Sequence, residues 1–176
     1  MPDWGKRLRS GLGRAAGRPS EIDVYHGLRS MALDVDPATI AVPDGEPWSG
    51  ALMAAMEVGL NKAIATIVAI ANGTVSMYVS TGGGVIGAGE HAVVKAAADR
   101  FRGVTADSRG LLQSTTDFPL PEPGQVRFQA RTADGAWTGV ATEEALRSGR
   151  HPLSALYAAG QDLLTEIRLS TPESTV

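Results

Sequence analysis

The sequence predicts an α+β domain in which an antiparallel sheet of two hairpins carries helices mainly on one face. Two turn signals support this prediction. Asn72-Gly73 and Asp134-Gly135 each lie between two β-rich runs, and such pairs favour the tight turns that join antiparallel strands. Segments with helical periodicity lie before, between and after the hairpins, so we expect the order helix, hairpin, helix, hairpin, helix.

Length and composition limit the class of protein. A chain of 176 residues suits one domain, and we expect a basic flexible arm at 1–20, a single α+β domain at 21–169 and a polar tail at 170–176. The net charge of −3 argues against a nucleic-acid partner, which calls for a basic face. The chain has no cysteine and no apolar run long enough to cross a bilayer, which predicts a cytoplasmic protein.

The N-terminal arm carries Trp4, Leu8 and Leu12 at four-residue spacing among five basic residues. On a helix these side chains would form an apolar stripe beside a basic face, which is typical of a contact with a partner or a membrane surface. Four glycines within the same stretch disfavour a helix by about 1 kcal/mol each relative to alanine. A disordered arm is therefore the favoured interpretation, with the contact as its alternative.

The first half of the domain begins with a helix at 21–33. Its inward positions are Ile22, Tyr25, Leu28 and Ala32. Asp36-Pro37 then starts one further turn, since proline loses nothing at the first helical position. Apolar residues at steps of three and four predict an amphipathic helix over 48–60, with Ser49 as its cap.

The hairpin at 63–80 is the strongest local signal. A two-residue turn at Asn72-Gly73 places Ala71 opposite Thr74. The face expected in the core is Ile64, Thr66, Val68, Ile70, Val75, Met77 and Val79. The other face is half apolar, so we expect a second layer or a partner subunit to cover Ile67, Ala69 and Tyr78 on it.

The glycine-rich segment at 80–91 follows this hairpin. Gly82, Gly84 and Gly87 match the spacing of a dinucleotide-binding loop, but the parallel strand–helix–strand context is missing. A structural joint is the favoured interpretation, with an anion or ligand site and an interaction loop as alternatives. The residues of that ligand site would be Ser80, Thr81, Gly82, Gly83, Gly84, Gly87, Gly89, Glu90 and His91.

The second half alternates between helices and strands. We expect a helix at 91–104, a short helical piece at 107–113 and a proline-rich loop at 115–124. Strands follow at 125–131 and 137–141, then a helical turn at 142–144 and a closing helix at 153–167. Arg127 and Arg131 lie on the exposed face of their strand beside Thr138, either solvated or facing an acidic partner.

Residues with catalytic or metal-binding chemistry form no recognisable set. His26, His91 and His151 lack the spacing of metal ligands, and His151 precedes Pro152 where a capping role is expected. We therefore expect neither a metal nor a cofactor. An enzyme of unfamiliar type around Glu90, His91 and His151 stays a third hypothesis.

The order of elements resembles the roadblock and longin group of profilin-like domains. The resemblance covers residues 50–170 and is carried by the hairpin IATIVAIANGTVSMYVS, the helix after it, the strands QVRFQART and GAWTGVA, and the helix PLSALYAAGQDLLTEIR. Roadblock domains have three strands in the second group, where only two are readable here, and residues 1–47 have no counterpart. The resemblance implies a non-catalytic homodimer that regulates or docks other proteins.

The first functional hypothesis is thus a regulatory or interaction scaffold, acting as a homodimer with an unknown protein partner. An acidic secretion chaperone belongs to the same class. The alternative is a small-ligand or anion-binding domain that uses the turn at 82–89.

Overall fold

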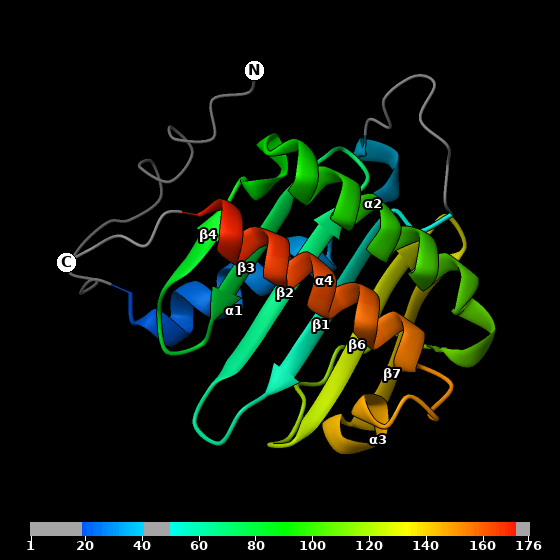
Figure 1. Ribbon diagram of the computed structural model, residues 1–176. Coiled ribbons are helices and arrows are strands. Elements are labelled where there is room, and N and C mark those ends of the chain that lie inside the picture. The colour runs from blue at the N-terminus through cyan, green and yellow to red at the C-terminus, as the bar shows by residue number, and fades with distance from the viewer. Residues whose placement is uncertain (1–18, 41–49, 172–176) are drawn as a thin grey trace.

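The computed structural model describes residues 19–40 and 50–171. Within these ranges seven strands form one antiparallel sheet in the order β4-β3-β2-β1-β6-β7-β5 (Figure 1). The strands are β1 (Met53–Gly59), β2 (Ile64–Ile70), β3 (Val75–Val79), β4 (Gly84–Ile86), β5 (Gln113–Ser114), β6 (Gln125–Thr132) and β7 (Gly135–Thr142). The α-helices of the described part are α1 (Glu21–Leu33), α2 (Ala92–Asp107), α3 (Glu143–Arg147) and α4 (Ser154–Ser170). The predicted α+β class with an antiparallel sheet is confirmed.

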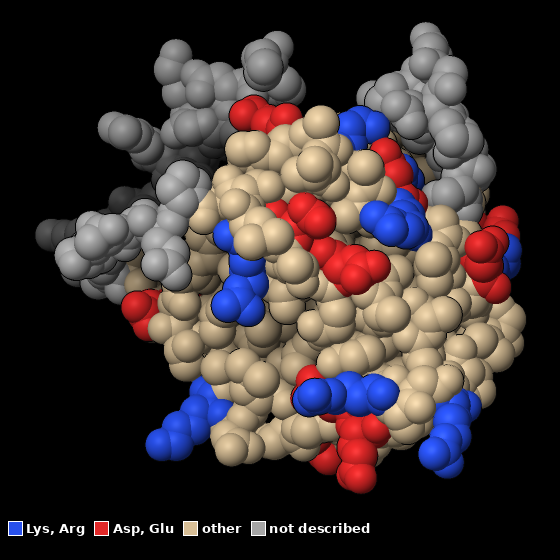
Figure 2. All heavy atoms as spheres, in the orientation of Figure 1, with Lys and Arg blue, Asp and Glu red and all other residues tan. Residues whose placement is uncertain are grey.

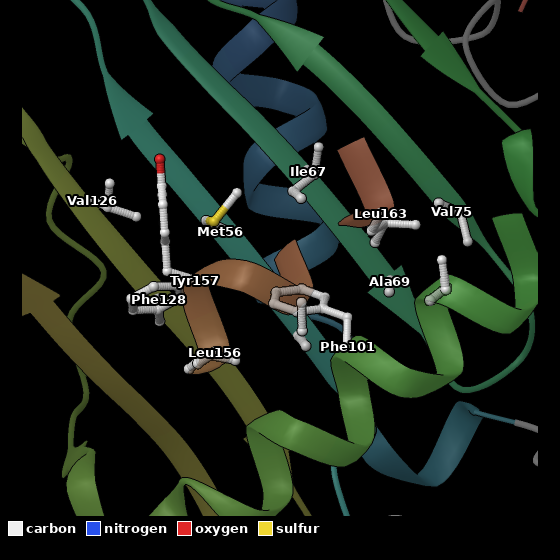
Figure 3. Close-up of a cluster of buried hydrophobic side chains, with 14 of the residues drawn as sticks. Met56, Ile67, Ala69, Val75, Phe101, Val126, Phe128, Leu156, Tyr157 and Leu163 are labelled. Atoms are coloured by element: carbon white, nitrogen blue, oxygen red, sulfur yellow. The ribbon is translucent and has the colours of Figure 1, made fainter. Parts of the chain in front are cut away.

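Helices cover both faces of the sheet. Figure 1 shows α2 and α4 side by side in front of the strands and α1 behind them. The larger core lies under α2 and α4, where Phe101 from α2 and Leu156 and Leu163 from α4 meet Met56 and Ile67 from the sheet (Figure 3). The smaller core under α1 consists of Tyr25, Leu33, Met53, Ala55, Val68 and Tyr78.

Helix α1 spans the predicted residues 21–33. Ser20 and Asp23 form a capping box, in which each side chain accepts a hydrogen bond from the other's backbone N–H. Tyr25 is buried as predicted. Ile22 is not: it lies in the first turn, where 44% of its surface is exposed.

The predicted helix over 48–60 is wrong, because residues 53–59 form the central strand β1. This strand pairs with β2 on one side and β6 on the other, and all its residues are buried. A strand covered on both faces shows no alternation of polar and apolar residues, so the steps of three and four resembled a helix. The expected cap Ser49 lies outside the described residues.

The hairpin of β2 and β3 is confirmed, but its register differs by one residue from the prediction. The Ile70 N–H donates to the Thr74 carbonyl at 2.9 Å, so the turn has three residues and ends with Gly73 at φ +87°. Ala69 therefore pairs with Val75. A slip of one residue moves every side chain of β3 to the other face, so the predicted core face combined residues from both faces.

Two short strands were not predicted. Residues 84–86, expected in the turn before a helix, form the edge strand β4 beside β3. Residues 113–114 form β5 beside β7, which gives the second group three strands, and the helical piece expected there is a 3-10 turn, Arg109–Leu111. Strands of two or three residues are too short to show alternation.

The other expected elements are present. Asp36 caps a 3-10 turn, Pro37–Thr39, through a hydrogen bond from the Ala38 N–H. Thr142 caps α3 by accepting a hydrogen bond from the Ala145 N–H. None of the described helices is long and apolar enough to cross a membrane.

The face formed by α2 and α4 carries interspersed charges of both signs (Figure 2). On α2, Asp99 lies 3.0 Å from Lys95 Nζ and 2.9 Å from Arg102 Nη2. These pairs are partly exposed and stabilise the helix by a few tenths of a kcal/mol each.

Candidate functional site

A buried ion pair fixes α1 on the sheet. Glu57 on β1 is fully buried, and its Oε1 and Oε2 atoms accept hydrogen bonds from Arg29 Nε at 2.6 Å and Arg29 Nη2 at 2.9 Å. Gln129 Nε2 donates a third, at 3.3 Å. Arg29 Nη2 also donates a hydrogen bond to the Phe118 carbonyl at 2.8 Å. The Arg29 side chain therefore connects α1 both to β1 and to the loop before β6.

Two tyrosines extend this polar cluster towards β3. The Tyr25 hydroxyl lies 2.9 Å from Thr66 Oγ1, and its ring meets Tyr78 edge-on at 5.7 Å between centroids. Burial, with the negative charge of Glu57 second, raises the pKa of Tyr78 above its usual value. Burial likewise raises the pKa of Tyr25. Burial alone would lower the pKa of Arg29. The hydrogen bonds to Glu57 and the attraction between the two charges outweigh it, so the pKa of Arg29 is raised. Both tyrosines therefore stay neutral and Arg29 stays charged at physiological pH.

The sequence did not predict that Arg29 and Glu57 form a pair. The sequence predicts Arg29 within the first helix at no special position, and it predicts Glu57 on a helix over 48–60 where the structure has β1. The available signal was Glu57 itself, one acidic residue inside the apolar run at 51–58. A buried carboxylate needs a partner, which predicts a basic residue nearby without saying which one.

The outward flank of α1 exposes apolar side chains. Val24 is 48% and Met31 62% exposed, and Leu28 lies between them, partly covered. These three residues, which we call the α1 stripe, lie at steps of four and three and so share one side of the helix. Gly27 adjoins the stripe, and a Cβ added there would meet nothing within 4 Å.

A cavity of about 190 Å³ lies between α1 and the turn that joins β3 to β4. Val24, Leu28 and Val79 contribute apolar walls, and Tyr78 lines it as well. The Tyr78 hydroxyl is buried and has no hydrogen-bond partner among the described residues. The cavity thus continues the α1 stripe inward.

The residues predicted to form an anion or ligand site do not form one loop before a helix. Residues 80–83 make the turn between β3 and β4, Gly84 begins β4, and His91 is the N-cap of α2 without a side-chain hydrogen bond. Ser80 Oγ accepts a hydrogen bond from the Ile64 N–H at 2.8 Å, which links the turn to the start of β2. Of the predicted site residues, only 80–84, which form the turn and the start of β4, lie together in space.

Close packing explains two of these glycines. A Cβ on Gly84 would collide with the Met77 carbonyl oxygen and a Cβ on Gly89 with the Gly73 carbonyl oxygen, whereas a Cβ on Gly82 would meet only the flexible end of the Glu21 side chain. Both collisions support the structural interpretation of the segment. The Glu21 carboxylate would also repel an anion at Gly82.

Ile67, Ala69 and Tyr78 are covered by layers of this chain and not by a partner subunit. Ile67 and Ala69 lie in the core under α2 and α4, and Tyr78 lies on the opposite face under α1. Their exposed fractions are 3%, 0% and 5%. The expectation that one face holds all three is wrong, because it used the shifted register of the hairpin.

Arg127 and Arg131 lie on an interior strand, since β6 pairs with both β1 and β7. Arg131 is only partly exposed: its Nε donates to the Leu33 carbonyl at 2.6 Å, and its guanidinium lies over the Phe118 ring. It thereby holds the C-terminal end of α1. Arg127 lines a cavity at the edge of β7 together with Thr138.

The histidines do not meet. His151 Nδ1 accepts the Leu153 N–H at 3.1 Å in the turn before α4, but Leu153 is the N-cap of this helix and no side chain caps it. His26 contacts the Tyr25 ring on α1. Among the described residues no group of three histidine or acidic side chains could hold a metal ion.

The predicted contact residues Trp4, Leu8 and Leu12 lie outside the described residues. No family model, curated protein or solved structure matches the chain.

Proposed function

We propose that this protein is a cytoplasmic, non-catalytic interaction domain that acts as a homodimer through the α1 stripe. The observation that carries the proposal is the run of Val24, Leu28 and Met31 on the outward flank of a helix whose inward side is fixed by an ion pair. Rigid attachment means that ordering α1 costs little when a partner binds. The resemblance to roadblock domains also implies a homodimer, but it does not include α1.

The occupant we propose for this surface is α1 of a second copy. Steps of four and three are the spacing of a helix–helix seam, and the stripe is therefore complementary to itself. Gly27 and Leu28 lie at the middle of α1. A twofold axis at this point therefore places the two helices antiparallel and side by side along their full length. Val24 of each copy then meets the partner's Met31.

Gly27 supports a close approach of the two helices. A glycine inside a helix costs about 1 kcal/mol relative to alanine. Nothing in the described part of the chain requires it, because a Cβ at this position would be in open space. In the proposed dimer, the missing side chain lets the partner's backbone approach.

Replacing both Val24 and Met31 with glutamate is expected to dissociate the dimer. Each variant chain places two carboxylates in the seam, where they repel those of the partner and lose solvation. We expect the dissociation constant to rise at least tenfold, which corresponds to roughly 1.4 kcal/mol. Sedimentation velocity over a concentration series measures it, and circular dichroism checks that the monomer stays folded.

The control is Leu169→Glu, which introduces one carboxylate at a residue of α4 that is 77% exposed. This variant should keep the wild-type mass. A wild-type protein that is monomeric at every concentration would contradict the proposal, and so would a double variant that remains dimeric.

Gly27→Ala is expected to separate fold stability from dimer stability. The alanine should stabilise α1 by about 0.5–1 kcal/mol and at the same time weaken the dimer several-fold, because its methyl group fills the approach path. Gly103 on α2 is the control: a Cβ there also meets nothing within 4 Å, so Gly103→Ala should stabilise the fold only. An unchanged dissociation constant for Gly27→Ala would show that the helices do not meet at this residue.

A further inference from the structure

We propose that the open edge of β7 holds a binding site for an oxyanion group, a carboxylate or phosphate, with Arg127 as its principal ligand. A cavity of about 310 Å³ lies at this edge. Its polar lining comes from Arg127, Gln113, Thr138 and His151. This volume is at the lower end of the range for small-molecule sites, so the oxyanion would belong to a ligand of few atoms.

No acidic side chain among the described residues forms an ion pair with Arg127. Glu57 lies directly opposite it on β1, but the Glu57 oxygens are taken by Arg29 and Gln129. The Nε atom of Arg127 is buried and has no hydrogen-bond partner among the described residues. A buried donor left without an acceptor is costly, and the planar guanidinium suits two parallel hydrogen bonds to an oxyanion.

The backbone of β7 supplies a second donor at the same place. The Glu143 N–H donates to the Gly124 carbonyl, so odd-numbered residues of β7 turn their polar groups towards β6. The Thr115 N–H donates to the Ala136 carbonyl, so even-numbered residues turn theirs to the β5 side. Strand β5 begins with Gln113, opposite Thr138, and does not extend as far as Val140. The Val140 N–H therefore lies at an unpaired edge beside the cavity.

The remaining lining favours an anion over a cation. His151 Nδ1 accepts the Leu153 N–H, so in the neutral ring the proton lies on Nε2 and this atom is a donor. Gln113 has an exposed amide that donates as well. None of the described residues lining the cavity is acidic.

The site and the α1 stripe are independent. The cavity belongs to the β7 edge of the sheet, whereas the stripe lies on α1 beside the turn between β3 and β4. We expect the monomer and the dimer to bind the oxyanion with the same affinity. Failure of one proposal therefore leaves the other standing.

A nuclear magnetic resonance titration of the full chain tests the site, with sodium acetate and sodium phosphate as separate probes and sodium chloride keeping the ionic strength constant. We expect saturable shifts of the Val140 amide and the Arg127 Nε–H signal with at least one probe. Arg127→Gln should raise the dissociation constant at least tenfold. Arg100→Gln removes the same charge from an exposed position on α2 and should not change it.

The two probes distinguish the sources of the oxyanion. Saturation by acetate alone assigns a carboxylate ligand, by phosphate alone a phosphoryl ligand, and by both the shared chemistry. Equal weakening by Arg100→Gln, or shifts that do not include Val140 and Arg127, would overturn the proposal. If Arg127→Gln does not fold, Arg127→Lys replaces it, because lysine keeps the charge but lacks the planar guanidinium. If neither variant folds, the positions of the shifted signals in the wild-type protein decide the question.

Discussion

Replacing Arg29 with methionine is expected to lower the free energy of unfolding by about 3–5 kcal/mol. The methionine fills much of the same space but removes the ion pair and both hydrogen bonds that Arg29 gives to the fully buried Glu57. Only the hydrogen bond from Gln129 and a long one from Thr66 then remain to the carboxylate. Urea unfolding, followed by circular dichroism, measures the difference.

Two further variants identify the cause. Arg109→Met breaks an exposed pair with Asp134, in which the side chains are 44% and 63% exposed, and should cost about 1 kcal/mol or less. The double variant Arg29→Met/Glu57→Leu should recover much of the loss, because it also removes the carboxylate that Arg29→Met leaves without its ion-pair partner. If Arg29→Met costs no more than Arg109→Met, the ion pair does not hold α1 in place and the docking surface loses its rigid support.

The elements that the sequence predicted correctly have local causes. Helix α1 begins at a capping box formed by Ser20 and Asp23, three residues apart. Strands β6 and β7 meet at Asp134-Gly135, and the sequence of β6 alternates between polar and apolar residues from Gln125 to Arg131. Such signals involve neighbours in the sequence, so they can be interpreted without the fold.

The errors have long-range causes. Strand β1 lost its alternation because helices far away in the sequence cover both of its faces. The register of β2 and β3 depended on whether the turn at Asn72-Gly73 has two or three residues, which the dipeptide alone does not fix. The error of one residue then placed Tyr78 on the same face as Ile67.

The candidate sites depend on contacts of the same kind. Arg29 and Glu57 are 28 residues apart, and Arg29 reaches Phe118 across 89 residues. Arg127 was singled out from the sequence because it is charged within a strand. Its unpaired state follows only from the pairing of Glu57 with Arg29, which no local pattern contains.

Ile67→Ala is expected to destabilise the protein by about 2–5 kcal/mol, because Ile67 is 3% exposed in the core that contains Phe101 and Leu163. The loss combines the transfer of the removed methyl and methylene groups with the cavity that they leave. Ile86→Ala is the matched control, since Ile86 on β4 is 68% exposed and should change stability by about 0.5 kcal/mol or less. Urea unfolding of both variants measures the difference.

Ile67→Asp separates an internal position from a subunit contact. At a subunit contact, the charge would dissociate the oligomer and leave a folded monomer. In the core, a carboxylate without a partner costs more than a domain of this size can lose, so we expect a chain without cooperative unfolding. A folded monomer with a nearly unchanged melting temperature would contradict the arrangement in which α2 and α4 cover this face. It would indicate instead that this face of the sheet forms the dimer contact.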